Sequence, residues 1–425
     1  ANTTNVYGTI IIGNYETGNG SNVANVVDSV IIGPGAGAYA TGCQLVIIGK
    51  NAGQYMANCR NVAIGYQAAQ FMSNGSETTV VGANAGWNCG NSVSSTFVGY
   101  EAGYSGAQHT VFVGSGAGKF AGNSTNNTVA IGYQAGAKDV GNNTVVIGAY
   151  SGNTTGERNT VAGSRAGANI GNNNVVSGFL SGRDIGDNNT IAGAIAGITA
   201  GDNNTVSGFI AGVTIGSNNS IFGTSAGRVL GTENCVFGAN AGISSTGSEN
   251  VIIGAQSGTL AEGIRNCIVG FRAGNSMISA GNNVFLGAFT GPTAPLEIGT
   301  TTENNVYVGT NTGNAGSRNT ILGDSAGIDS SGDINTIVGT DASGPMSGDL
   351  NTVVGAYSGN DGYRNTIVGS LSGNIMANVS NNNVLVGYAA GSALGNGLNN
   401  TLVGSFAGSA LVSGNLNTYI GYDSG

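Results

Sequence analysis

The stretch Asn159-Thr160-Val161-Ala162-Gly163 returns 15 residues later as Asn174-Val175-Val176-Ser177-Gly178, and the same period continues as far as Gly242. Each copy is followed by a small residue and a second glycine, as in Ala166-Gly167 and Ser181-Gly182. A fixed period of this length indicates one structural unit, or coil, per repeat, with each coil stacked on its neighbours.

We number each repeat from its first glycine, the anchor glycine at position 0, so the asparagine is at position −4 and an apolar residue is at position −2. Glycine recurs too often for a helix, since each one costs about 1 kcal/mol in a helix interior. In a strand the side chains alternate between two faces, so positions −4, −2 and 0 share one face. The predicted core column at position −2 contains Val161, Val176, Ile191, Val206, Ile221 and Val236.

The same alternation turns the asparagines inward, at a corner where a turn leaves backbone groups unpaired. Stacked amides can bond to those groups and to the next coil, which predicts a structural ladder. The predicted ladder consists of Asn159, Asn174, Asn189, Asn204, Asn219 and Asn234. The glycines at positions 0 and +4 would supply the tight or left-handed backbone that closes each coil.

The composition favours one architecture for the whole chain. With 78 Gly, 4 Pro and 8% charged residues among 425, the chain is neither an ordinary globular domain nor a collagen, which needs glycine at every third residue. Anchor glycines recur from Gly13 to Gly421 at a mean spacing of about 16 residues. We predict an all-β parallel β-solenoid, a β-roll or β-helix, as a single continuous domain over residues 1–425. It would contain about 25 coils with two short strands each, and coil lengths would range from ~14 to ~18 residues.

The longest interval between anchor glycines, from Gly287 to Gly309, contains Gly291-Pro292-Thr293-Ala294-Pro295. Two prolines cannot lie in a hydrogen-bonded ladder, so we predict a loop insertion near residues 288–303. This loop is either a binding loop or a tolerated insertion, and we favour the insertion.

Outside the central block, position −1 also becomes apolar, which makes both faces of the strand hydrophobic. An uncovered apolar stripe of this length would be unusual on a monomer. Lateral packing against other chains is therefore predicted, with an assembly face near the C-terminus that contains Val338, Val354, Val368, Val386 and Val403.

Repeat-like sequence begins within the first few residues and stops at Gly425, partway round a coil. If Gly425 met Ala1 of another copy, the interval from Gly421 to the next Gly13 would fall inside the range of the internal repeats. Head-to-tail stacking of this kind would build filaments. A fragment of a longer repetitive chain would show the same spacing.

The net charge of −9 and the pI of about 4.4 argue against nucleic acid or an anionic membrane as a partner. No apolar run approaches the ~20 residues of a membrane span, so we expect no membrane insertion. We expect an extracellular location or one on a cell or virion surface, and the expected partner is the chain itself.

Five cysteines are present, and they form no metal motif. Cys43 and Cys59 both lie at position −6 of successive repeats, which would bring their Cα atoms within about 5 Å and suits a disulfide. Cys235 and Cys267 lie at position −3 two repeats apart, too far to pair with each other, and are interpreted as small apolar fillers. Cys89 has no assigned role.

The sequence offers little catalytic chemistry. His109 is the single histidine, and no Ser/His/Asp arrangement can be built around it. Asp184, Asp187 and Asp202 with Arg183 are the closest carboxylate cluster, but aspartates are ordinary at polar turns. We therefore expect no enzyme activity and no cofactor. We also expect no metal site, since the Gly-Gly-x-Gly-x-Asp calcium repeat is absent.

Blocks such as Asn127-Thr128-Val129-Ala130-Ile131-Gly132-Tyr133-Gln134-Ala135-Gly136 resemble the repeats of phage and viral tail-fibre proteins and related bacterial surface proteins. They are also similar to the repeats of trimeric autotransporter adhesin heads, which implies a parallel β-roll. The regular glycine at position +4 departs from the adhesin repeat. Asn204-Thr205-Val206-Ser207-Gly208 resembles plant ice-binding β-rolls, which implies a flat outward face such as Thr336 with Val338.

Three functions follow as hypotheses. The first is a structural subunit of an extracellular fibre, built by head-to-tail stacking and lateral packing of apolar faces. The second is the shaft or head of a trimeric adhesin or of a viral or phage tail fibre that binds a cell-surface ligand. Ice binding is the third, and the mixed residues of the outward columns argue against it.

Overall fold

The computed structural model confirms the predicted fold class. Within the part of the chain that it describes, the structure is an all-β parallel β-solenoid of about 23 coils with about 16 residues per coil and without any helix. None of these residues therefore forms an apolar helix that could cross a membrane. The structure describes residues 5–13, 23, 25–122, 125–259, 261–275, 281–291, 303–313, 316–328, 330–344, 347–359, 361–376 and 380–425.

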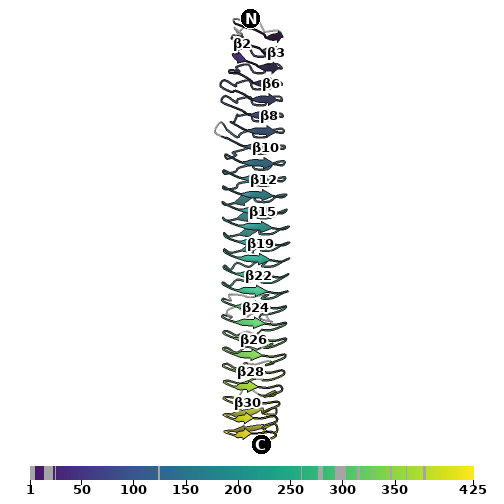
Figure 1. Cartoon of the computed structure of the whole chain (residues 1–425), viewed down its shortest axis with the longest axis vertical. Helices are drawn as coiled ribbons and strands as arrows, with labels where there is room; N and C mark the ends of the chain where they lie inside the picture. The colour runs from purple at the N-terminus through teal and green to yellow at the C-terminus, as the bar shows by residue number, and fades with distance from the viewer. Residues whose placement is uncertain are drawn as a thin grey trace. The chain divides into compact units, whose positions relative to one another are not determined.

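The chain divides into two compact units, Ala1–Ser207 and Gly208–Gly425. In each unit, three-residue parallel strands stack in chain order to form a main sheet (Figure 1). Most of the predicted insertion near 288–303 lies outside the described residues, since 292–302 are not described.

The main sheet of the first unit consists of β1 (Ile10–Ile12), β3 (Val30–Ile32), β5 (Val46–Ile48), β6 (Val62–Ile64), β7 (Thr79–Val81), β8 (Thr96–Val98), β9 (Val111–Val113), β10 (Val129–Ile131), β11 (Val145–Ile147), β12 (Thr160–Ala162), β13 (Val175–Ser177), β15 (Thr190–Ala192) and β17 (Thr205–Ser207). The main sheet of the second unit consists of β19 (Ser220–Phe222), β21 (Cys235–Phe237), β22 (Val251–Ile253), β23 (Cys267–Val269), β24 (Val284–Leu286), β25 (Val306–Val308), β26 (Thr320–Leu322), β27 (Thr336–Val338), β28 (Thr352–Val354), β29 (Thr366–Val368), β30 (Val384–Val386), β32 (Thr401–Val403) and β34 (Thr418–Ile420).

A second strand of the coil is formed only in some places. The pairs are β2 (Val26–Val27) with β4 (Gly42–Cys43), β14 (Asp184–Ile185) with β16 (Thr199–Ala200), β18 (Thr214–Ile215) with β20 (Val229–Leu230), and β31 (Asn396–Leu398) with β33 (Ser413–Asn415). Elsewhere single parallel bridges, such as Val140 with Thr155, continue the pairing. The main sheet is therefore the continuous element of each unit.

The core is a set of columns that run along the stack. At position −2, equivalent residues such as Val161 and Val176 are direct partners in the sheet, and both are buried. A second column at position +3 holds fully buried small residues such as Ala166 and Ser181. A third column, seven residues after the anchor glycine, contains Ile185 and other buried side chains. Each larger apolar side chain contributes roughly 1.5–3 kcal/mol, so stability comes from stacking many coils.

The two glycines of each coil are needed for different reasons. At Gly178 (position 0, φ +138°), a Cβ would lie 2.1 Å from the carbonyl oxygen of Gly193 in the next coil. At Gly182 (position +4, φ +55°), the backbone is left-handed and a Cβ would lie 2.8 Å from Val176 Cγ1 in the core. The first glycine allows neighbouring coils to approach, and the second allows the chain to turn over its own core residue.

Gly178→Ala should destabilise the chain by roughly 1–3 kcal/mol, because the added methyl group requires both a strained φ and a wider separation from Gly193. The neighbouring exposed Ser177→Ala variant is the matched control and should have little effect. Thermal unfolding followed by circular dichroism compares the two variants. Equal melting temperatures for wild type and Gly178→Ala would contradict the close approach.

Candidate functional site

The asparagines at position −4 lie inside the solenoid and are almost fully buried. In the first unit, Asn159 Oδ1 accepts the backbone N–H of Asn174 at 2.8 Å, and Asn174 Oδ1 accepts that of Asn189 at 2.8 Å. Asn189 Oδ1 does the same for Asn204 at 2.9 Å. Each side chain therefore pairs a buried backbone donor of the next coil.

The second unit contains an equivalent asparagine column of its own. Asn219 Oδ1 accepts the backbone N–H of Asn234 at 2.9 Å, and Asn234 Nδ2 donates to the carbonyl of Gly247 at 3.0 Å. The column continues with Asn250, Asn266, Asn283, Asn305, Asn319, Asn335, Asn351, Asn365, Asn383, Asn400 and Asn417. These amides are committed to the protein's own backbone, so the column has a structural role.

Hydroxyl residues replace asparagine in several coils near the N-terminus, which the sequence analysis missed. Thr78 Oγ1 donates to the carbonyl of Ser92 at 3.0 Å, and Thr128 Oγ1 donates to that of Gly141 at 3.1 Å. Both threonines occupy position −4, and both are buried. The signal was available in the sequence, since these residues keep the same spacing from the anchor glycine.

An aromatic column was also missed. Its rings stack from coil to coil with centroids 4.8–5.4 Å apart in the order Tyr39, Tyr55, Phe71, Trp87 and Tyr104. Three of these four contacts are stacked, so neighbouring rings cover each other's faces. Their spacing in the sequence follows the repeat, which is the signal that predicts such a stack.

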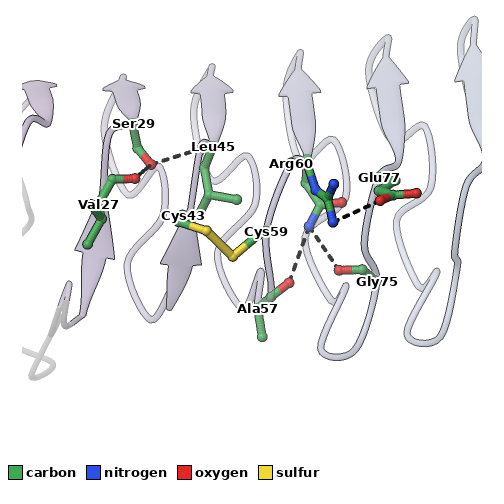
Figure 2. The surroundings of a disulfide bond; sticks show 10 residues. Val27, Ser29, Cys43, Leu45, Ala57, Cys59, Arg60, Gly75 and Glu77 are labelled. Atoms are coloured by element: carbon green, nitrogen blue, oxygen red, sulfur yellow. Dashed lines mark hydrogen bonds and ion pairs between the residues drawn. A yellow bond between two sulfur atoms is a disulfide. The ribbon is translucent and has the colours of Figure 1, made fainter.

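Cys43 and Cys59 lie in neighbouring coils, and a disulfide joins them with 4.6 Å between their Cα atoms (Figure 2). Beside it, Arg60 forms an exposed ion pair of 2.9 Å with Glu77 one coil further on. On the other side, Ser29 Oγ accepts the backbone N–H of Leu45 at 2.9 Å. The bridge cross-links two successive coils and so restricts the unfolded chain.

The other three cysteines are free thiols. Cys89 is fully buried, and burial raises the pKa of its thiol to about 12. It therefore stays protonated and has no nucleophilic role at ordinary pH. Cys235 is exposed and Cys267 is half-buried, as the first residues of β21 and β23.

The carboxylates near Arg183 act as caps between coils. Asp187 Oδ1 accepts the backbone N–H of Asn172 at 2.6 Å, and Asp202 Oδ1 accepts that of Asp187 at 2.8 Å. Asp184 Oδ1 accepts a bond from an asparagine amide at 2.9 Å. Across the described ranges, no group of three or more His, Cys, Asp and Glu side chains is placed to hold a metal ion.

The histidine found in the sequence is away from these carboxylates. His109 is exposed in a turn with a left-handed backbone (φ +52°), and its backbone N–H donates to the carbonyl of Val93 at 2.8 Å. A hollow of about 270 Å³ lies in the coils that follow His109, lined in part by Asp139, Asn142 and Glu157. Asn142 bonds there to Asn126 at 2.8 Å and to Glu157 at 3.4 Å, so its amide serves contacts between coils.

The assembly-face valines end five consecutive strands of the main sheet, β27 to β30 and β32. Each is the direct sheet partner of the next, so the structure brings all five into one outward column. Val354 and Val368 are 37% exposed, and Val338, Val386 and Val403 are half-buried. The column is flanked by the first residues of the same strands, mostly threonine.

No family model matches the chain, and a search of curated proteins finds no match.

Replacing one ladder asparagine should be costly. In Asn189→Ala the backbone N–H of Asn204 loses its acceptor at 2.9 Å and the Asn204 amide loses one at 3.0 Å. The Asn204 side-chain amide keeps its bond to the Gly201 carbonyl at 3.0 Å. The main cost is therefore the loss of the Asn189 acceptor by the buried backbone N–H, about 1–3 kcal/mol. Thr190→Ala, at the exposed first residue of β15, is the control and should be nearly neutral.

Hydrogen exchange measures this effect locally. The Asn204 amide proton should exchange faster in Asn189→Ala than in Thr190→Ala or the wild type. Unchanged protection at Asn204 would mean that the side chain does not hold this backbone donor.

Proposed function

We propose that the chain is a structural subunit of an extracellular fibre, built by head-to-tail stacking of solenoids and by lateral packing of apolar faces. The observation that carries the proposal is the outer face of the main sheet in the second unit. From β19 to β34, the outward first and third residues of these strands include no charged residue and no proline. We call this surface the outer face.

An uncharged β-sheet surface of this length needs a cover. Monomeric proteins rarely expose a contiguous apolar patch larger than a few hundred Å², and larger patches mark interaction surfaces. On the outer face, large side chains remain exposed, with Phe237 at 58% and Ile253 at 37%. Packing of a second sheet against this face, about 10 Å away, would remove these side chains from water.

A second copy of the same chain is a suitable cover for the outer face. Strands of a sheet repeat at about 4.8 Å, so two faces with the same coil repeat stay in step along their whole contact. A partner with a different repeat would lose this match after a few coils.

End-to-end growth would use the interactions that already join coils within each unit. These are the parallel strand pairing, the asparagine bonds and the close glycine contacts, and all of them recur from one coil to the next. A coil of another copy can supply the same groups. A contact of this kind does not close on itself, so it produces filaments.

The proposed location is outside the cell or on a cell or virion surface. The Cys43–Cys59 disulfide supports it, since disulfides persist mainly in oxidising compartments. The alternative function is the shaft or head of a trimeric adhesin or of a viral or phage tail fibre that binds a cell-surface ligand. It shares the solenoid but requires an assembly with a fixed number of chains.

Charge on the outer face should block lateral packing. The double variant Val354→Lys with Val368→Lys should weaken lateral association at least about tenfold, because burying two unpaired ammonium groups costs several kcal/mol. Tyr357→Lys, an exposed position outside the strand β28, is the matched control and should assemble like wild type. Sedimentation velocity at several concentrations measures the association. Normal assembly of the double variant would disprove the lateral contact.

Electron microscopy separates the two candidate functions. A fibre subunit should form filaments many times longer than the particles that the same chain forms at high dilution. Their length should increase with protein concentration. Uniform short particles of constant stoichiometry at every concentration would instead indicate an adhesin or tail-fibre segment.

A further inference from the structure

We propose that two copies of the chain pair face to face across β21, β22 and β23, with their coils stacked in opposite directions. We call this pair antiparallel. Two disulfides then join Cys235 of each copy to Cys267 of the other. This inference rests on the lateral packing proposed above, and it adds the orientation, the register and the covalent link. The outer face of these three strands carries the evidence.

The two thiols are arranged symmetrically about one residue. In the sheet, Val251 pairs directly with Cys235 on one side and with Cys267 on the other. All three residues are the first of their strands and point to the outer face, where Val251 is 37% exposed. Both cysteines are free. Because they are two strand spacings apart, about 9.5 Å, they cannot form a disulfide within one chain, which requires Cα atoms closer than about 7 Å.

A two-fold axis parallel to the strands, placed between two copies at the level of Val251, gives each thiol a partner. Such an axis reverses the direction of the stack and keeps first residues opposite first residues. Val251 then faces Val251 of the second copy, and Cys235 faces Cys267 of the second copy. The bond requires the two sheets to approach at the cysteines until the Cα atoms are within about 7 Å, closer than the ~10 Å mean separation of packed sheets. A disulfide joins the two packed sheets of immunoglobulin domains in this way.

Charged residues beside the face favour the same arrangement. The residue two positions before each strand is Glu233 for β21, Glu249 for β22 and Arg265 for β23. In the antiparallel pair, Glu233 of each copy lies level with Arg265 of the other copy. A pair with parallel stacks would be related by an axis along the stack, which reverses the strand direction. Glu233 of one copy would then lie at the opposite strand end from Arg265 of the other, and this charge pairing would be absent. The two Glu249 residues meet at the axis, and each is paired with Arg265 of its own chain at 2.9 Å, so each Arg265 would bridge Glu249 of its own chain and Glu233 of the second copy.

Side-chain sizes also match in this register. At the third strand position, the most exposed ring of this region, Phe237, faces the smaller Val269 of the second copy, which is half-buried. Ile253 meets its own equivalent at the axis. One coil further out, Phe222 faces Leu286. A large side chain opposite a smaller one lets the two faces interdigitate, as tight packing requires.

The covalent step needs an oxidant, and a small-molecule disulfide supplies it by exchange. The Cys235 thiolate attacks that disulfide and releases one small thiol. The Cys267 thiolate of the second copy then attacks the mixed disulfide and releases the other. For each bridge, two cysteine thiols lose two electrons, and one small disulfide is reduced to two thiols.

The test uses the full chain and the single variants Cys235→Ser and Cys267→Ser, each incubated with oxidised glutathione. Wild type should form a covalent dimer on a non-reducing gel, and peptide mass spectrometry should identify Cys235 linked to Cys267. Each variant alone should form less than a tenth of that dimer, because its remaining thiol faces a serine. An equal mixture of the two variants should restore the dimer, since Cys267 of one then faces Cys235 of the other.

The outcomes separate this inference from the proposed function. Strong cross-linking of either variant alone would indicate a different register or an unspecific contact and would overturn the inference. Wild type that associates laterally in sedimentation but forms no covalent dimer would also overturn it and leave lateral packing intact. Wild type that does neither would overturn both. Circular dichroism of both serine variants checks that they fold like wild type.

Discussion

The fold depends on how closely successive backbones approach at the anchor glycine. A Cβ at Gly99 would lie 2.5 Å from the carbonyl oxygen of Gly114, and similar contacts recur at the anchor glycines of both units. No other residue fits there without moving the coils apart. Because this contact fixes the strands to one another, differences in coil length are absorbed elsewhere. Val306 pairs with Val284 across a long coil and with Thr320 across a short one, and the strand register is the same in both pairs.

Such close stacking buries backbone groups at the corner before each strand, and these must be paired. The asparagine at position −4 meets this need because one amide both accepts and donates a hydrogen bond. Asn250 accepts the backbone N–H of Asn266 at 2.9 Å and donates to the carbonyl of Gly263 at 2.9 Å. A hydroxyl group can serve the same backbone groups, which explains why coils with Thr78 or Thr128 at this position fit the same stack.

The sequence predicts those columns of the fold in which the same kind of residue recurs from coil to coil. Position −2 is always apolar in the central block, and asparagine recurs at position −4, so both columns can be found by counting from one glycine. The third core column is harder to find, because it mixes Thr155, Ile170 and Ala200 and lies in the part of the coil whose length varies. The sequence does not predict the caps of Asp187 and Asp202, since a bond from an aspartate to the backbone of the preceding coil has no sequence signature of its own.

A repetitive face has one general weakness as an interface: equal coils do not specify register, because a shift by one coil restores most contacts. Information about register must come from positions that break the repeat. In the second unit these are Phe222 and Phe237 among aliphatic residues, the two cysteines around Val251, and the change from Glu249 to Arg265 beside the strands. In the proposed pair, a one-coil shift would place Phe237 opposite a different side chain and move Cys235 away from Cys267 of the second copy. The irregular residues of this otherwise uniform face are therefore the ones that can align two copies.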